Sequence, residues 1–147
     1  MNIKKIPKNI IGNYNLNNED ASYLISIGLE TGNFGCIDIY EGFETVNNFI
    51  VLGYDNDVPI CCSNNTGIIA IEPGHTRLVN SSVEQFVTSI NIFSRYCKEV
   101  VTADSEVSQL NIVNIAIAEL RDTDEQAWSS NYNYWPIIGD QMIEGNL

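Results

Sequence analysis

The 147-residue sequence predicts an α+β fold, in which an antiparallel-rich sheet packs against an N-terminal helix and about three C-terminal helices. Two observations support this fold class. Apolar runs separated by short Gly and Asn turns fill residues 33–79, and long helical stripes appear after them. Because parallel strands need long crossovers, such short turns favour antiparallel pairing. The length suits a single domain over 1–147, with the Asn- and Lys-rich residues 1–15 expected to be irregular.

The first helix is expected to begin at about residue 17. Asn17 or Asn18 can cap it, because an Asn side chain accepts hydrogen bonds from the first free backbone N–H groups. Glu19 and Asp20 then lie in the first turn, where the helix dipole favours carboxylates. Gly28 can end the helix in the left-handed conformation.

The strand region contains one alternating stretch and three continuous apolar runs. Alternation marks residues 34–40, the runs cover 49–53, 59–62 and 68–71, and 76–79 can add a further strand. A continuous run indicates a strand covered on both faces, or on one face beside a poorly solvated edge. The turn Asn64-Asn65-Thr66-Gly67 joins the second and third runs and favours a hairpin.

The clearest helix signal follows residue 80. A capping box can form from either of two pairs, Ser81 with Glu84 or Ser82 with Gln85. The apolar residues that follow at helical spacing are Val83, Phe86, Val87, Ile90 and Phe93.

Two further helices are expected. One begins near Ser105 and has the apolar stripe Val107, Leu110, Val113, Ile117 and Leu120. The last has Pro136 at its first position, where its missing N–H is harmless, and Gly145 past its end. Its inward residues are Ile138 and Met142.

The charge is strongly acidic and unevenly spread. Nineteen acids against seven Lys and Arg give a formal charge of −12, and no Lys or Arg occurs between Lys8 and Arg77. Such a field repels nucleic acids and anionic membranes and attracts a basic protein partner, although acidity equally suits a protein kept soluble. The candidate partner-binding residues are Glu41, Glu44, Asp55, Asp57 and Glu72.

The cysteines indicate a reducing compartment. Cys36, Cys61, Cys62 and Cys97 form no Cys-x-x-Cys pair and lie in apolar stretches, where a free thiol behaves as a small hydrophobe. Neighbouring Cys61 and Cys62 are expected to point to opposite faces of a strand. No signal peptide or membrane span is expected, because the first residues precede no apolar run and no apolar stretch reaches 18 residues. We therefore expect a cytoplasmic protein.

No group of residues predicts an active site, so neither an enzyme nor a cofactor is expected. His75 is the only histidine, and its Pro-Gly-rich setting indicates a surface turn, not a Cys–His pair. A zinc site would need Cys pairs or several histidines. Asp55-Asn56-Asp57 resembles the opening of a calcium loop, but Ile60 and Thr66 stand where glycine and the last acid belong, which favours a polar turn.

A group of aromatic residues lies near the C-terminus. It can form a binding hot spot, because Trp and Tyr are enriched there, or the seam on which the last helix docks. The seam is favoured for Trp128, Tyr132, Tyr134 and Trp135.

Three segments in fixed order, 48–61, 67–72 and 78–86, precede the chain's end with Tyr134-Trp135-Pro136 and Gln141 to Gly145. Together they resemble the SUKH superfamily, which is related to the yeast cell-wall assembly regulator, and in particular its bacterial immunity proteins. The resemblance covers roughly residues 20–147. It implies an α+β fold and no catalytic residues.

The resemblance also implies a function. Members neutralise a cognate polymorphic or contact-dependent toxin, and direct stoichiometric binding is the expected means. An acidic inhibitor suits a basic, nuclease-like toxin domain in particular. The alternative is a non-catalytic regulatory or scaffolding module related to the eukaryotic branch.

Overall fold

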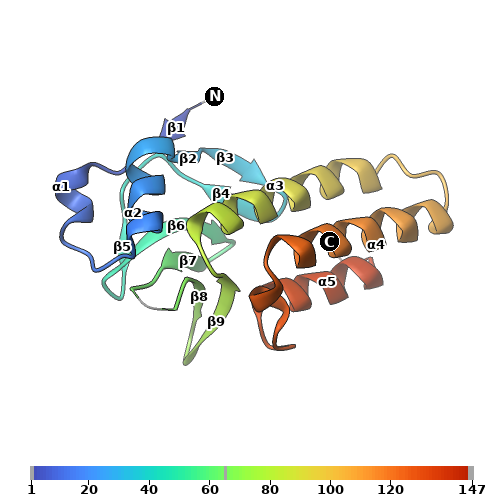
Figure 1. Cartoon of the computed structure of the whole chain (residues 1–147). Helices are drawn as coiled ribbons and strands as arrows, with labels where there is room; N and C mark the ends of the chain where they lie inside the picture. The colour runs from blue at the N-terminus through green and yellow to red at the C-terminus, as the bar shows by residue number, and fades with distance from the viewer. Residues whose placement is uncertain (1, 65, 146–147) are drawn as a thin grey trace.

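The computed structural model describes residues 2–64 and 66–145, which form a sheet followed by three long helices (Figure 1). The N-terminal part contains β1 (Ile3–Lys4), α1 (Lys8–Ile11), α2 (Asn18–Ser22), the π-helical turn η1 (Tyr23–Ile27) and β2 (Leu29–Glu30). The strands of the main sheet are β3 (Gly32–Phe34), β4 (Ile37–Ile39), β5 (Thr45–Val46), β6 (Phe49–Asp55), β7 (Val58–Cys62), β8 (Ile68–Glu72) and β9 (His75–Asn80). The C-terminal part contains α3 (Val83–Val100), α4 (Glu106–Thr123), the 3₁₀ turn η2 (Glu125–Trp128) and α5 (Tyr134–Glu144).

The predicted α+β class is confirmed. The main sheet has seven strands in the order β3-β4-β6-β7-β8-β9, with β5 beside β6, and every pairing in the described chain is antiparallel. The expected hairpin between the second and third apolar runs is formed by β7 and β8, with Cys62 opposite Ile68. Within its turn, Asn65 lies outside the described residues.

The expectation that residues 1–15 are irregular is wrong for residues 3–4 and 8–11. β1 pairs with β2, where Ile3 lies opposite Glu30, and α1 makes a single helical turn. Ile6 and Ile11 are buried in the core. A two-residue strand exists through its pairing partner, so local sequence carries no signal for it.

The first predicted helix forms with the expected cap. Asn17 Oδ1 accepts a hydrogen bond from the Asp20 N–H at 2.8 Å. Gly28 follows η1 as expected, but the predicted left-handed cap conformation is wrong: its φ of 78° and ψ of −172° lie outside the left-handed helical region, because the chain passes directly into β2. Asp20 differs from expectation, because its side chain is buried and its Oδ1 accepts the Val83 N–H at 2.8 Å. Asp20 therefore joins α2 to the start of α3.

Helix α3 follows its prediction closely. Ser82 Oγ accepts the Gln85 N–H at 3.2 Å, which selects the Ser82–Gln85 pair as the cap. Gln85 Nε2 donates to the Thr123 carbonyl, at the end of α4. The buried residues Val83, Phe86, Ile90 and Phe93 all belong to the predicted stripe.

The stripe predicted for α4 is wrong in its first half. Ser105 caps the helix and Val113 and Leu120 are buried, but Val107 is 71% exposed and Leu110 50% exposed. The paired helices α3 and α4 extend past the sheet (Figure 1), so little of the chain covers this tip. In α5, Asn133 precedes the helix, so Pro136 lies within the first turn and not at its start.

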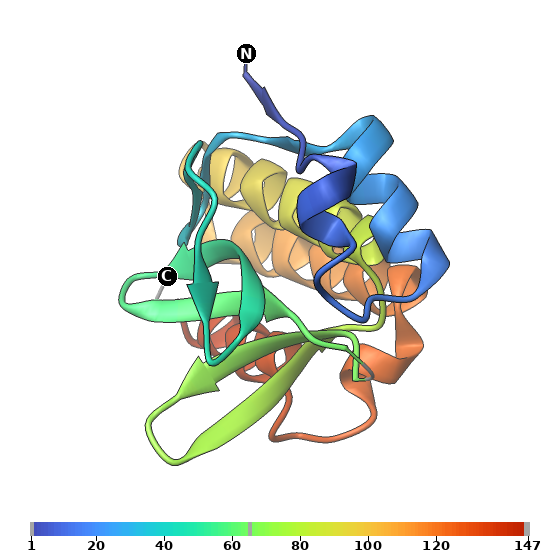
Figure 2. The ribbon, with the colours of Figure 1, turned by 90° about the vertical axis from the view of Figure 1, so that its left-hand side faces the viewer.

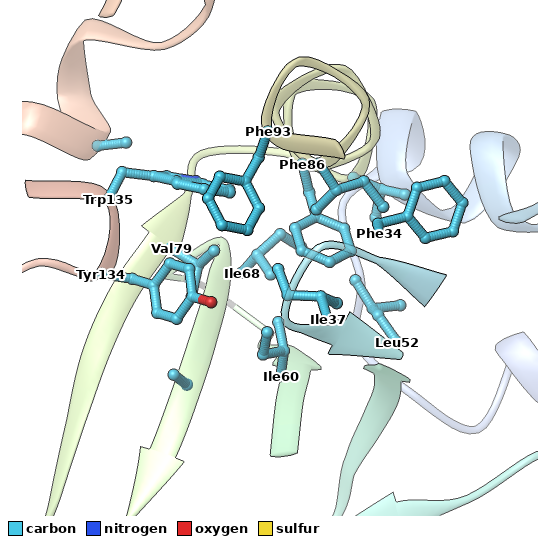
Figure 3. Close-up of a cluster of buried hydrophobic side chains, with 14 of the residues drawn as sticks. Phe34, Ile37, Leu52, Ile60, Ile68, Val79, Phe86, Phe93, Tyr134 and Trp135 are labelled. Atoms are coloured by element: carbon cyan, nitrogen blue, oxygen red, sulfur yellow. The ribbon is translucent and has the colours of Figure 1, made fainter. Parts of the chain in front are cut away.

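The core lies between the sheet and the long helices. In Figure 3, Phe86 and Phe93 of α3 and Trp135 of α5 meet the sheet residues Ile60 and Ile68. Trp135 packs edge-on against Phe93, with ring centroids 5.7 Å apart. Burying one such side chain contributes roughly 1.5–3 kcal/mol, so this cluster holds the helices on the sheet.

The opposite face of the sheet carries a second, smaller apolar cluster. Val51, Cys61 and Ile69 are buried in it, whereas Cys62 belongs to the main core, so the two neighbouring thiols point to opposite faces as expected. Figure 2 shows the strands in front of α3, α4 and α5, which lie behind the sheet.

Candidate functional site

Three of the predicted partner-binding residues line one cleft. It has a volume of about 480 Å³ and lies between α5 and the sheet end that carries the β6–β7 and β8–β9 turns. Asp55, Asp57 and Glu72 contribute carboxylates, while Val58 and Ile137 contribute apolar wall. We call this the acidic cleft.

Two tight turns bring these carboxylates together. Asp55 lies opposite Val58, so Asn56 and Asp57 form a two-residue hairpin turn, in which Asn56 has φ 54°. Asn tolerates this left-handed conformation better than most residues. The segment that resembles a calcium loop is therefore a polar hairpin turn, the favoured alternative.

A short chain of hydrogen bonds forms the floor of the cleft. Tyr134 Oη donates to Asp55 Oδ2 at 2.8 Å, and Cys36 Sγ lies 3.5 Å from the same hydroxyl. Burial raises the pKa of Tyr134 well above its usual value and the pKa of Cys36 to about 12. Since a thiolate is the reactive form of cysteine, Cys36 is a neutral, inert thiol at physiological pH.

Glu72 is already compensated. Its Oε2 accepts a hydrogen bond from Arg77 Nε at 2.6 Å, and His75 Nε2 lies 2.7 Å from the same oxygen. Arg77 also donates to the Tyr132 carbonyl, which fixes its position. Asp57 differs, because it is exposed and its side chain has no partner among the described residues. The net negative charge of the cleft therefore comes from Asp55 and Asp57.

Glu41 and Glu44 lie outside the acidic cleft, on the segment between β4 and β5. Asn2 Nδ2 donates to Glu41, and Tyr54 Oη donates to Glu44. The hydrogen bond to Glu44 raises the pKa of Tyr54 to about 12. The five predicted residues thus form two groups, three in the cleft and two on the segment between β4 and β5.

Of the predicted aromatic group, Tyr134 and Trp135 are buried where α5 meets the sheet, so the seam is confirmed for them. Trp128 is half-buried beneath Arg121, whereas Tyr132 is 80% exposed. The sequence analysis included Tyr134 in the aromatic group but did not predict its hydrogen bond to Asp55, because 79 positions separate the two residues.

Neither a cluster of metal ligands nor a membrane-spanning helix is present in the described part of the chain. Within residues 2–64 and 66–145, no three His, Cys, Asp or Glu side chains are grouped so that they could hold a metal ion. No helix in this same part of the chain has both the length and the hydrophobicity needed to span a bilayer.

Comparison with known proteins identifies a family. The model of the SUKH-4 immunity protein family matches residues 16–141, which include the acidic cleft and both groups of carboxylates. No curated protein and no solved structure matches the chain.

Proposed function

The chain belongs to the SUKH-4 immunity protein family, and we propose that it neutralises its cognate toxin by binding a basic surface of that toxin at the acidic cleft. Family membership makes it a non-catalytic protein that acts by toxin neutralisation. The proposal concerns the site and the chemistry of the partner.

The uncompensated charge of Asp55 and Asp57 is the observation that carries this proposal. Both carboxylates border a cleft large enough for a side chain, and Asp57 is exposed with no partner in the described chain. A carboxylate pair of this kind attracts a cation and speeds encounter with a basic partner.

The walls of the cleft favour a lysine or an arginine. Val58 and Ile137 offer apolar surface for the methylene stem of such a side chain, while its head reaches Asp55 or Asp57. Arginine can bind a carboxylate through two parallel hydrogen bonds. A nuclease-like toxin domain, whose nucleic-acid cleft is basic, has this chemistry, and we propose that the two proteins meet in the cytoplasm.

The test uses a candidate cognate toxin domain. Asp57→Lys reverses an exposed, unpaired charge, so the fold is expected to stay intact. Asp55→Asn removes a charge but keeps an oxygen for the Tyr134 hydroxyl. Both variants are expected to weaken toxin binding in calorimetry, Asp57→Lys by about tenfold or more, and to flatten its dependence on salt.

Asp104→Lys is the matched control, because it makes the same charge change in the exposed loop between α3 and α4. It is expected to bind within about threefold of wild type, which is under 1 kcal/mol. Equal affinity and equal salt dependence for wild type and Asp57→Lys would exclude the cleft as the site. Failure of the wild-type protein to protect cells that express the toxin would exclude this toxin as the partner.

A further inference from the structure

The sheet face turned away from the long helices is apolar, and we call it the open face. Three residues of this face are buried, Val51, Cys61 and Ile69. The partly buried residues packed around them are Val46, Phe49, Tyr54 and Ile71. All seven belong to β5–β8, and no helix in the described chain contributes to the cluster. An antiparallel sheet with one solvated face normally alternates apolar and polar residues. The continuous apolar runs of β6, β7 and β8 therefore exceed what the helix-covered core requires.

Aromatic and acidic side chains surround this cluster. Tyr40 is 58% exposed and packs against Tyr54, with ring centroids 6.0 Å apart. Asp38 lies opposite Tyr54 in the sheet and so shares its face, and the Glu44 carboxylate accepts a hydrogen bond from the Tyr54 hydroxyl. An apolar centre with Tyr and a polar rim is the usual composition of a protein interface.

The open face has almost no positive charge of its own. The strands from β3 to β8 contain no Lys or Arg, because none occurs between Lys8 and Arg77. Lys4 Nζ donates to the Tyr40 carbonyl at 3.0 Å, but Lys4 is buried at 9% exposure. The charge complement of this face is therefore a basic protein surface.

We propose that the open face is a second part of the toxin interface, covered by an apolar segment of the toxin that is flanked by Lys or Arg. The inference rests on the toxin-neutralising function proposed above. Tyr54 and Asp55 are neighbours on β6, and their side chains point to opposite faces of the sheet. A toxin bound at this end of the sheet can therefore contact both the open face and the acidic cleft.

Charge also distinguishes the toxin from a second copy of this chain. Two copies joined through their open faces would bring Asp38 and Glu44 of each protomer together, on molecules that each carry a formal charge of −12. Like charges placed opposite one another weaken such an interface. A basic partner is instead attracted by the same carboxylates.

Two lysine substitutions test the open face. Tyr40→Lys replaces an exposed aromatic, and Thr76→Lys adds a cation at an exposed position opposite Ile71, hence on the same face. Each is expected to weaken binding of the toxin domain about tenfold or more in calorimetry. Val107→Lys and Ile115→Lys, at exposed apolar positions of α4, are the controls and are expected to stay within about threefold of wild type.

Thermal unfolding of each variant shows whether it still folds. Wild-type affinity in both Tyr40→Lys and Thr76→Lys would overturn the inference and leave the proposed function standing, provided that the wild-type protein neutralises the toxin. A wild-type protein that fails to bind the toxin would overturn both the inference and the proposed function. Sedimentation velocity gives a separate outcome, since a wild-type dimer that Tyr40→Lys dissociates would assign the open face to a second copy and also overturn the inference.

Discussion

Asn80 is a buried amide at which β9, α3, α5 and the end of α4 meet. Its Oδ1 accepts the Trp135 indole N–H at 2.9 Å, and its Nδ2 donates to Ser89 Oγ and Asp124 Oδ2, each at 3.1 Å. Because the amide is fully buried, water cannot replace these bonds. Asn80 therefore lets the large Trp135 side chain be buried without an unsatisfied donor.

Replacing Asn80 by Ala is expected to lower the free energy of unfolding by about 3 kcal/mol, because it leaves the Trp135 N–H without its acceptor and removes a donor from Asp124. Urea denaturation followed by circular dichroism measures this change. Asn91→Ala is the control, since Asn91 is exposed and its effect is expected to be about 0.5 kcal/mol or less. Equally small effects at both positions would show that the buried network adds little stability.

At the scale of elements, Asp20 couples α2 to α3 through its bond to the Val83 N–H. Burial raises the pKa of Asp20, and the hydrogen bonds from Val83 and Asn17 oppose this shift in part. The folded state therefore holds the Asp20 proton more tightly than the unfolded state. The resulting stabilisation is complete below the unfolded-state pKa of about 3.9 and is lost as the pH rises through the raised folded-state pKa.

Asp20→Asn removes this titration and keeps an oxygen for the Val83 N–H. Wild type is thus expected to lose stability relative to Asp20→Asn as the pH rises from about 4 towards neutrality. Urea denaturation at several pH values measures the difference. Asp20→Ala, which also lacks the acceptor, is expected to be less stable than Asp20→Asn throughout. A wild-type-to-Asn difference that does not change with pH would contradict a raised pKa.

Elements with local signals could be predicted from the sequence. Helix α3 has its cap and its apolar stripe within a few residues of one another, so both were found. The exposure of Val107 and Leu110 could not be predicted, because helical periodicity tells which side is apolar but not how far the covering layer extends. Strand β1 escaped prediction for a related reason, since it depends on its pairing with β2.

In the candidate site, too, contacts between residues close in sequence could be predicted and a distant contact could not. Asp55 and Asp57 lie together because a two-residue turn joins β6 to β7, and that turn is evident in the sequence. Arg77 compensates Glu72 from the neighbouring strand, a contact that hairpin geometry makes foreseeable. The hydrogen bond from Tyr134 to Asp55 could not be predicted, because Tyr134 belongs to α5, which is separated from β6 in the sequence by α3 and α4.

At the scale of the whole molecule, carboxylates outnumber the cations that could pair with them. Nineteen acids face seven Lys and Arg. Among the described residues, Glu72 pairs with Arg77, and Arg95 pairs with Glu99 and Glu119. Most of the acidic charge is therefore mutually repulsive, which favours a basic partner but destabilises the folded chain itself.

Salt is therefore expected to act in opposite directions on folding and on toxin binding. Raising NaCl from about 20 to about 300 mM shortens the screening length and weakens repulsion within the chain. The unfolding midpoint is expected to rise by roughly 3 °C, equivalent to about 1 kcal/mol for a chain of this size. Over the same range the affinity for a basic toxin falls, because its attraction to the acidic surface is screened as well.

Thermal unfolding and calorimetry in matched buffers measure the two effects on the same preparation. Near pH 4 many carboxyl groups are protonated, so the salt effect on stability is expected to shrink there. A midpoint that falls with added salt would mean that attractive pairs outweigh repulsion in the folded state. Opposite slopes would instead show that the charge which weakens the free protein is the charge that binds its partner, so that complex formation relieves a repulsion present in the fold.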